Sequence, residues 1–296
     1  MQGIHIHSML QRVLKQEGAW LLALFQCSYG KPIKLFLLLL SGLVTAVPAF
    51  AQKPTPVRIK EVTIAVGISV PPYVDRETQS GIELQIIHEA LAEEGYRMQL
   101  KFLAGNGSAN NFVAKRVDAM LVNRYTPISE DAVPTGFPSE NIIHYHNFAF
   151  SLKASNYKVQ DIDGLSNFRV IGFYNAAKML GPEFAVAVQR SPLYREVAVQ
   201  TDQVIALYRG MVDVAIADSR IFTHFQDKLR RTSGEFHEVT MFDVFPPSPR
   251  HLIFQHKQVR DSFDRGLTKL KASGRYQAIL TTNTASFTRF HYQGEP

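Results

Sequence analysis

The stretch Arg209-Gly210-Met211-Val212-Asp213-Val214-Ala215-Ile216-Ala217-Asp218 decides the fold. A basic residue and a glycine end a helical segment, Val-Asp makes a tight turn, and a short apolar strand follows. The same arrangement occurs earlier, in Lys115-Arg116-Val117-Asp118-Ala119-Met120-Leu121-Val122. Each copy predicts a helix, a turn and a buried strand of an α/β lobe. Two copies predict two similar lobes with a cleft between them.

The residues around the first copy alternate between strand and helix patterns. Residues 62–69 and 98–102 read as strands, residues 82–94 as an amphipathic helix closed by Gly95, and residues 108–116 as a short helix. The strand from Val117 completes a β-α-β-α-β order. This order predicts right-handed crossovers and a mainly parallel sheet flanked by helices.

A second β-α-β-α-β set surrounds the second copy. We expect strands at residues 168–173, 197–199 and 212–217, a helix over about residues 176–189, and a further helix capped by Thr201 or Asp202. The apolar strands at 148–153 and 251–256 bracket this set, and a helix ended by Gly274 follows. We therefore predict hinge strands at 148–153 and 251–256, one lobe formed by residues 52–148 plus 256–296, and the other by 154–250. Such a two-stranded connection permits bending.

The first 51 residues have the layout of a secretory signal peptide. Lys31 and Lys34 precede an apolar run at residues 35–46, and Ala49-Phe50-Ala51 offers a small-x-small cleavage site. The leader before the run is long, so either the true start lies downstream of Met1 or the leader is unusually extended. A retained anchor is the alternative, although the run is shorter than the ~20 residues that span a bilayer. We expect cleavage after Ala51 and a periplasmic protein.

The charge balance and the cysteine content exclude some classes of function. The chain of 296 residues carries a net charge of +6, and loss of the leader would leave 28 basic and 25 acidic residues. That balance is too mild for a nucleic-acid partner. The single cysteine, Cys27, falls within the leader, so the mature chain is expected to lack disulfides and thiol chemistry.

The order of these elements resembles the extracellular solute-binding proteins of family 3, periplasmic receptors that deliver polar amino acids to ABC importers. The matching segments span roughly residues 60 to 280 and are Pro72-Tyr73, residues 81–84, Val117-Asp118-Ala119, Phe137-Pro138-Ser139, Asp163-Gly164-Leu165, residues 170–173 and residues 210–218. The resemblance implies a type II periplasmic-binding-protein-like fold, two lobes joined by two crossover strands. It also implies a small polar ligand, an ABC permease as membrane partner, and a monomer.

Two positions depart from the pattern that the resemblance implies. Amino-acid binders of the family carry an arginine shortly after a Thr-Pro pair, where it clamps the ligand carboxylate. Here Thr126-Pro127 lacks that arginine, and Arg124 just before the pair is the substitute we consider. A small hydroxyl residue at the helix start of the second lobe is replaced by Asn175 and Ala176. The aspartate that holds the ligand ammonium is matched by Asp218.

The ligand-site candidates follow from where strands end, because open α/β sheets bind ligands beyond the carboxyl ends of their strands. They are Tyr73, Arg124, Tyr125, Thr126, Tyr174, Asn175 and Asp218. Each has a structural alternative. Asp218 can cap the next helix, Tyr73 can pack in a core, and Asn175 can cap a helix whose free amides would otherwise accept an anion. Glu83 at a helix start suits the helix dipole as well as a ligand.

No catalytic, metal or cofactor site is predicted. Asp118 and Asp213 begin strands and are interpreted as structural. His144 and His146 share a strand face but lack a third ligand at suitable spacing, and residues 105–108 lack the lysine of a phosphate loop. Two further functions remain open: a dehydratase-like enzyme on the same scaffold, with Glu83 or Asp218 as the acid, and a sensory or accessory binding module.

Overall fold

The structure is a computed structural model that describes residues 60–103, 105–123 and 136–282. The predicted signal peptide and the candidates Arg124, Tyr125 and Thr126 lie outside these residues. Among the helices in the described ranges, none combines the length and the apolar character that a membrane crossing requires.

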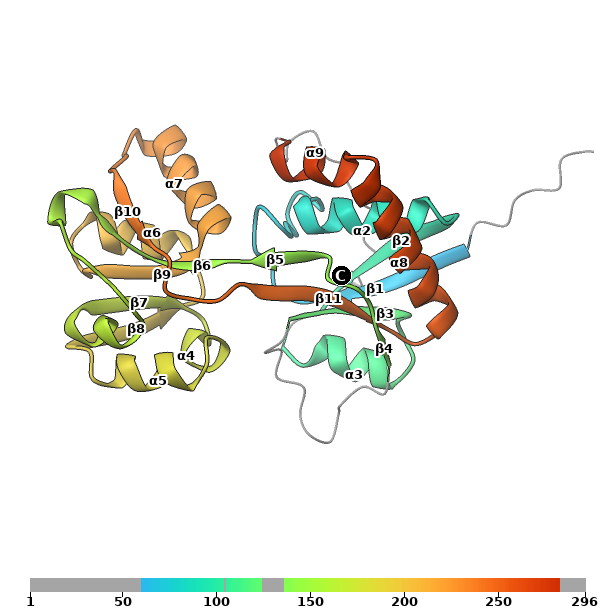
Figure 1. The fold of residues 1–296 in the computed structure, drawn as a ribbon, viewed down its shortest axis with the longest axis horizontal. Coiled ribbons are helices and arrows are strands. Elements are labelled where there is room, and N and C mark those ends of the chain that lie inside the picture. The colour runs from blue at the N-terminus through green and yellow to red at the C-terminus, as the bar shows by residue number, and fades with distance from the viewer. Residues whose placement is uncertain (1–59, 104, 124–135, 283–296) are drawn as a thin grey trace, which may run out of the picture. The chain divides into compact units, whose positions relative to one another are not determined.

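Two separate sheets with flanking helices make up the described chain (Figure 1). The first sheet has the order β2-β1-β3-β11-β4, with β5 also paired to β11. Its strands are β1 (Lys60–Val66), β2 (Tyr96–Phe102), β3 (Ala119–Asn123), β4 (Phe137–Pro138), β5 (Ile143–Tyr145) and β11 (Ser248–Phe254). Strand β1 is parallel to β2 and β3, whereas β11 is antiparallel to its neighbours. This sheet and its helices are the first lobe.

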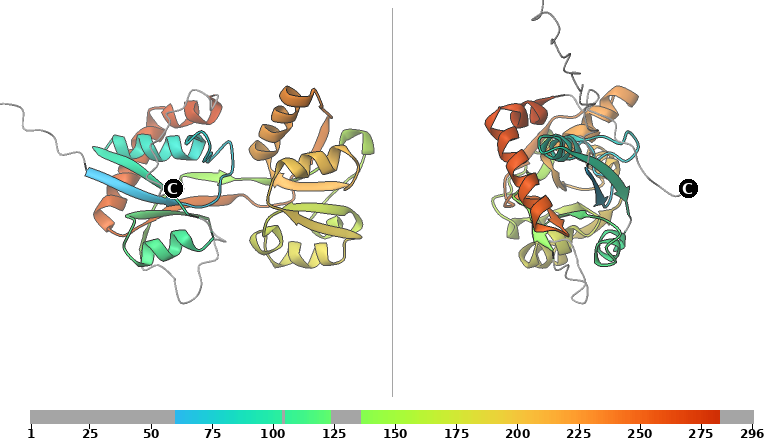
Figure 2. Two further views of the ribbon diagram at one scale, coloured as in Figure 1. Left: turned by 180° about the vertical axis from the view of Figure 1, so that it is seen from behind. Right: turned by 90° about the vertical axis from the view of Figure 1, so that its right-hand side faces the viewer.

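Helices cover both faces of the first sheet. They are α2 (Ile82–Ala92), α3 (Gly107–Val113), α8 (Lys257–Ala272) and α9 (Arg275–Thr281). Along β1, Ile64 and Val66 pack with the core of α2 and α8, while Ala65 between them packs with Phe112 of α3. This alternation places α3 opposite α8 (Figure 2). Helices α2 and α8 approach closely because Gly266 has no side chain; a Cβ there would lie 1.9 Å from the Ala90 carbonyl oxygen.

The second lobe is built around a sheet of order β10-β6-β9-β7-β8. Its strands are β6 (Asn147–Leu152), β7 (Arg169–Phe173), β8 (Leu193–Val197), β9 (Val214–Asp218) and β10 (Val239–Phe242). Its helices are α4 (Ala176–Met179), α5 (Pro182–Gln189), α6 (Thr201–Tyr208) and α7 (Ser219–Ser233), with 3-10 turns at Lys153–Ser155 and Asp163–Asn167. Strands β7, β8 and β9 are parallel, and β9 is buried along its whole length. The apolar run of the opening motif is therefore a central strand.

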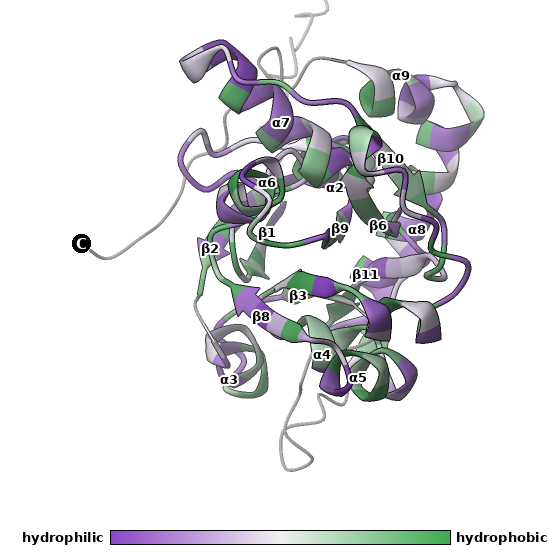
Figure 3. Ribbon diagram, turned by 90° about the vertical axis from the view of Figure 1, so that its left-hand side faces the viewer, coloured by the Kyte–Doolittle hydropathy of each residue, from purple (hydrophilic) through white to green (hydrophobic). Residues whose placement is uncertain are grey.

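Hydrophobic residues of the second lobe gather on the two faces of its sheet. Val214 and Ile216 pack on one side with α4 and α5, and Ala215 and Ala217 pack on the other with α6 and α7. Helix α7 mixes hydrophilic and hydrophobic residues (Figure 3), as expected for a helix with one face against a sheet.

Several local expectations are wrong in detail. The helix predicted over residues 176–189 is two helices, because Gly181 adopts a positive φ of 98° and Pro182 starts a new helix. The strand expected at 197–199 is β8, which ends at Val197. Helix α6 has Gln200 as its N-cap and no side-chain capping bond, so neither Thr201 nor Asp202 caps it.

The chain passes between the sheets at two places. The first crossing is His146, between β5 of the first sheet and β6 of the second; the other is residues 243–247, between β10 and β11. Strands β6 and β11, which contain most of the predicted hinge segments, each pair within one sheet. Both form long extended segments in Figure 1.

Candidate functional site

Asp218, the last residue of β9, is a buried acid whose oxygens accept hydrogen bonds from four groups. The backbone amides of His146, Arg220 and Ile221 donate to it at 2.7, 2.9 and 3.2 Å. The Tyr73 hydroxyl donates at 3.0 Å. Asp218 is thus the N-cap of α7, the structural role considered from the sequence. Burial raises the pKa of this carboxyl above its ordinary value, against the effect of its donors.

Tyr73 reaches Asp218 from the turn between β1 and α2 in the first lobe. The turn that carries it is held by α2, since the amides of Ile82 and Glu83 donate to the carbonyl oxygens of Pro72 and Tyr73 at 2.9 and 3.0 Å. Gly81 allows this approach, because a Cβ there would lie 2.2 Å from the Tyr73 carbonyl oxygen. The Tyr73 ring is buried, and burial beside Asp218 raises the pKa of its hydroxyl, so it stays a donor.

A buried ion pair lies behind Tyr73. Arg250 of β11 donates from Nε and Nη2 to the Glu83 carboxylate at 3.1 and 3.4 Å, and Tyr145 of β5 donates its hydroxyl to Glu83 at 2.9 Å. The Tyr145 ring stacks on Tyr73 with centroids 4.0 Å apart, and the Arg250 guanidinium lies 4.9 Å from the Tyr145 ring centroid. Glu83 is fully buried, and its role is to hold Arg250 and Tyr145, which its position at a helix start did not indicate.

The sequence did not single out Tyr145 or Arg250. Both stand near predicted strands, and the position of Arg250 directly before the predicted strand at 251–256 was the only local signal. Nothing local to either residue indicates a partner in α2.

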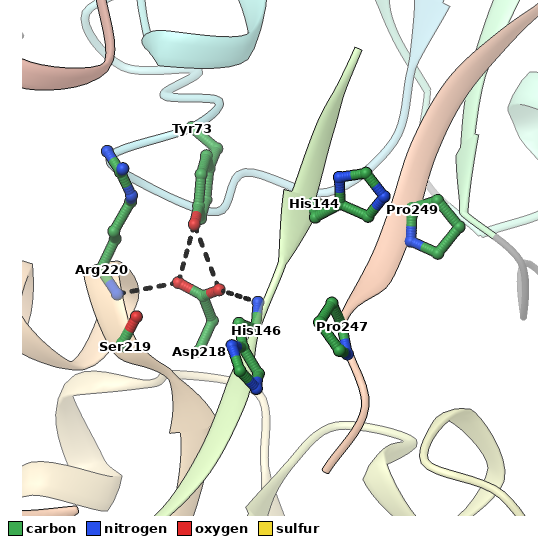
Figure 4. Close-up of a pocket in the computed structure, with 8 residues that line it drawn as sticks. All are labelled: Tyr73, His144, His146, Asp218, Ser219, Arg220, Pro247 and Pro249. Atoms are coloured by element: carbon green, nitrogen blue, oxygen red, sulfur yellow. Dashed lines mark hydrogen bonds between the residues drawn. The ribbon is translucent and has the colours of Figure 1, made fainter. Parts of the chain in front are cut away.

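A hollow of about 620 Å³ opens beside Asp218 (Figure 4). We call it the crossover hollow, and its lining is Tyr73, His144, His146, Asp218, Ser219, Arg220, Pro247 and Pro249. Both crossing segments contribute. They are tied together by His146, whose Nε2 lies 2.8 Å from Asp243 Oδ1 and 3.0 Å from the Phe245 carbonyl oxygen. Figure 4 shows the Tyr73 hydroxyl pointing at Asp218 and the Arg220 side chain extending away from the histidines.

Tyr174 and Asn175 follow β7 at the same sheet edge but do not line the crossover hollow. Tyr174 is 60% exposed. Asn175 is the N-cap of α4 in the left-handed region, with a φ of 65° and no side-chain capping bond.

The amides considered as an anion site at α4 are already occupied. Glu196 of β8 accepts from the amide of Asn175 at 2.7 Å and from that of Ala177 at 2.9 Å, and the Tyr194 hydroxyl donates to it at 2.8 Å. Glu196 directly precedes the predicted strand at 197–199 and is the second-last residue of β8, and nothing local to it indicates partners in α4.

Asp118 and Asp213 have the structural role expected of them. Each accepts a hydrogen bond from the backbone of the neighbouring strand, Asp118 from Thr63 and Asp213 from Arg169, both at 2.8 Å. Within the described ranges, no three His, Cys, Asp or Glu side chains gather closely enough to hold a metal ion.

Comparison with known proteins supports the fold. No protein-family model matches the chain, and no curated protein sequence matches it. Solved structures do match. An arginine-binding protein of T. maritima has a TM-score of 0.53 at 15% identity, covering 74% of this chain and 93% of its own. The arginine-, lysine-, histidine-binding protein ArtJ of Geobacillus stearothermophilus has a TM-score of 0.55 at 13% identity, covering 78% and 97%.

A histidine kinase sensor domain with similarity to periplasmic binding proteins is equally alike, with a TM-score of 0.55 at 15% identity over 75% of this chain and 95% of its own. These likenesses confirm the predicted fold: the chain has the two-lobed architecture of periplasmic binding proteins. Of these three neighbours, two are binding proteins and one is a sensor domain.

Proposed function

We propose that this chain is an exported solute-binding protein that captures a small polar solute between its two lobes and presents it to an ABC permease. The observation that carries the proposal is the meeting of Tyr73 and Asp218. Tyr73 lies in the turn between β1 and α2 of the first lobe, Asp218 is the last residue of β9 in the second lobe, and both line one hollow bounded by the two crossing segments. Ligands of α/β sheets bind at such edges.

The mechanism involves binding without chemical conversion. A solute that contacts both lobes favours the arrangement in which those contacts coexist, and the size of the shift equals its differential affinity for the two arrangements. Asp218 is the anionic contact. Because its donors are backbone amides and a phenol, its charge is not neutralised by a cation among the groups that hydrogen-bond to it. A ligand ammonium would supply the positive charge that these donors lack.

A thermal-shift screen tests the proposal. Amino acids, polyamines and small carboxylates are each added to the purified protein, and a true ligand at 100 times its dissociation constant stabilises the fold by about 2.7 kcal/mol. Asp218→Asn should weaken the binding of that ligand by ~2 kcal/mol, the scale for a buried charged hydrogen bond. Asp202→Asn, on the exposed first turn of α6, is the control. A screen without any stabilising solute contradicts the proposal.

Export is tested separately. N-terminal sequencing of periplasmic material should begin at Gln52. Recovery of the uncleaved chain in membranes would contradict this part.

A sensory role is the second candidate, favoured by the likeness to the kinase sensor domain. It predicts the same solute binding but a signalling partner instead of a permease. Co-purification from membranes in the presence and absence of the solute separates the two. The enzyme alternative has less support at Glu83, because that carboxylate is paired with Arg250. A turnover assay with prephenate-like acids tests it.

A further inference from the structure

Helix α7 belongs to the second lobe, but one of its faces packs against the first lobe. Ile221 is 4% exposed and is part of the hydrophobic cluster that β1, α2 and α8 build. Phe225 follows four residues later and therefore lies on the same side of the helix. Its ring packs against that cluster and also against a cluster of its own lobe. The lobes are thus joined by apolar packing in addition to the two crossing segments.

Arg220 adds a polar contact between the lobes. Its Nη1 donates to the Leu280 carbonyl oxygen at 2.7 Å. Leu280 lies in the last turn of α9, where backbone carbonyls lack partners within the helix. The same guanidinium acts on Tyr276 of α9, because burial raises the pKa of that hydroxyl and the positive charge of Arg220 opposes the rise. Arg220 therefore ties α7 to α9.

His224 follows Arg220 by four residues and lies near the first lobe as well. Burial lowers the pKa of its imidazole, as do the charges of Lys228 and Arg231 on α7, whereas the Asp75 carboxylate of the first lobe opposes this shift. The neutral imidazole is the form that burial favours. The approach of α7 to the first lobe therefore extends from α9 to the turn that precedes α2.

These four side chains, which we call the α7 face, are Arg220, Ile221, His224 and Phe225. Only Arg220 among them lines the crossover hollow, so a solute in the hollow would leave Ile221 and Phe225 untouched. The packing of Ile221 and Phe225 is made between protein groups alone. Bending at the crossing segments that separated the lobes would return the Ile221 side chain to water, which is unfavourable for an aliphatic group.

We propose that the α7 face is a latch that holds the two lobes together before any solute binds, with Ile221 as its main apolar contact. This inference goes beyond the proposed solute-binding function, since it concerns the position of the lobes in the free protein. Apparent affinity scales with the fraction of protein already in the binding-competent arrangement. The latch therefore sets how much of the closure a solute has to drive.

Hydrogen–deuterium exchange of the purified protein without added solute tests the latch. Ile221→Ala removes most of the apolar contact. Amides of the first lobe at residues 70–80 and 275–282 should then exchange about tenfold or more faster, a shift that deletion of a buried isoleucine side chain can produce. Leu229→Ala is the matched control, because Leu229 is on the same helix and packs with the cluster of the second lobe. Unchanged first-lobe exchange in Ile221→Ala overturns the latch, and so does equal acceleration in both variants.

A second variant measures the separation of the lobes. Ile221→Lys places a charge against the core of the first lobe, which should hold the lobes apart and raise the radius of gyration in small-angle X-ray scattering. Leu229→Lys should leave that radius at the wild-type value. A wild-type radius in Ile221→Lys, with native circular dichroism, overturns the latch; if this variant does not fold, the exchange result for Ile221→Ala decides. Neither measurement uses a solute, so a failed latch is distinguishable from a failed solute-binding function.

Discussion

The two lobes contain the same turn in different surroundings. In the first lobe the Asp118 carboxylate accepts the Thr63 amide at 2.8 Å, and in the second the Asp213 carboxylate accepts the Arg169 amide at 2.8 Å. Asp213 accepts more hydrogen bonds than Asp118, because the Arg169 side chain also donates to it from Nε and Nη2 at 3.0 and 2.7 Å. In both lobes the aspartate of the Val-Asp motif therefore accepts an amide of the adjacent strand. The side chains packed nearby determine whether it also has a charged partner.

The buried acids of the lobes differ more strongly. Glu83 in the first lobe has a guanidinium partner in Arg250, whereas Asp218 in the second is held by amides and a phenol. An acid with a cationic partner is balanced within the fold. Asp218 has no cationic partner among its hydrogen-bond donors, and this contrast directs the ligand proposal to the second lobe.

The largest effect should come from breaking the balanced pair. Glu83→Ala leaves the Arg250 guanidinium buried without its carboxylate, which we expect to cost ~3–5 kcal/mol of unfolding free energy. Urea denaturation followed by circular dichroism measures it. The double variant Glu83→Met with Arg250→Met should recover much of the loss, because it removes both charges. A double variant as unstable as the single one would contradict the role of the pair.

Comparison of the two turns should give a smaller difference. Asp118→Ala and Asp213→Ala should each cost ~1–3 kcal/mol, the scale for leaving a buried amide without its acceptor. Asp213→Ala should cost more by up to ~1 kcal/mol, since Arg169 is partly exposed and its ion pair is screened by solvent. The same denaturation curves decide this, and a costlier loss at Asp118 would reverse our ranking of the lobes.

Removal of the Tyr73–Asp218 hydrogen bond between the lobes should have the next largest effect on the free energy of unfolding. Tyr73→Phe deletes the hydroxyl that donates to Asp218 while keeping the ring on Tyr145, and should cost ~1–2 kcal/mol. Tyr96→Phe at the start of β2 is the matched control. If both substitutions prove equally mild, the Tyr73–Asp218 bond contributes nothing measurable.

The smallest expected effect is a change in how stability depends on pH in the acidic range. Hydrogen bonding to Arg169 lowers the pKa of Asp213 below its ordinary value of 3.8. A lowered folded-state pKa stabilises the fold above the unfolded-state value, and this contribution is lost as pH falls through the folded-state pKa. Asp213→Asn should therefore flatten the loss of stability below about pH 4. Melting temperatures measured from pH 6 to pH 2 test this, and parallel curves for both proteins would contradict it.

Local sequence was sufficient for the main strands and helices of the fold. Periodicity and turn residues act over neighbouring positions, so β1, α2, β7, β9 and α8 were predictable, as was the placement of Asp218 at a strand end. Gly181-Pro182 was the local signal of the break inside the helix predicted over residues 176–189.

The partners of the site residues were decided by the tertiary structure alone. Glu83 and Arg250 are 167 positions apart, and Tyr73 and Asp218 are 145 apart. Glu196 reaches the α4 amides only because β8 pairs with β7. A sequence pattern specifies which face of a strand or helix a residue occupies, whereas a buried charge is matched by whichever side chain the topology brings within hydrogen-bonding distance.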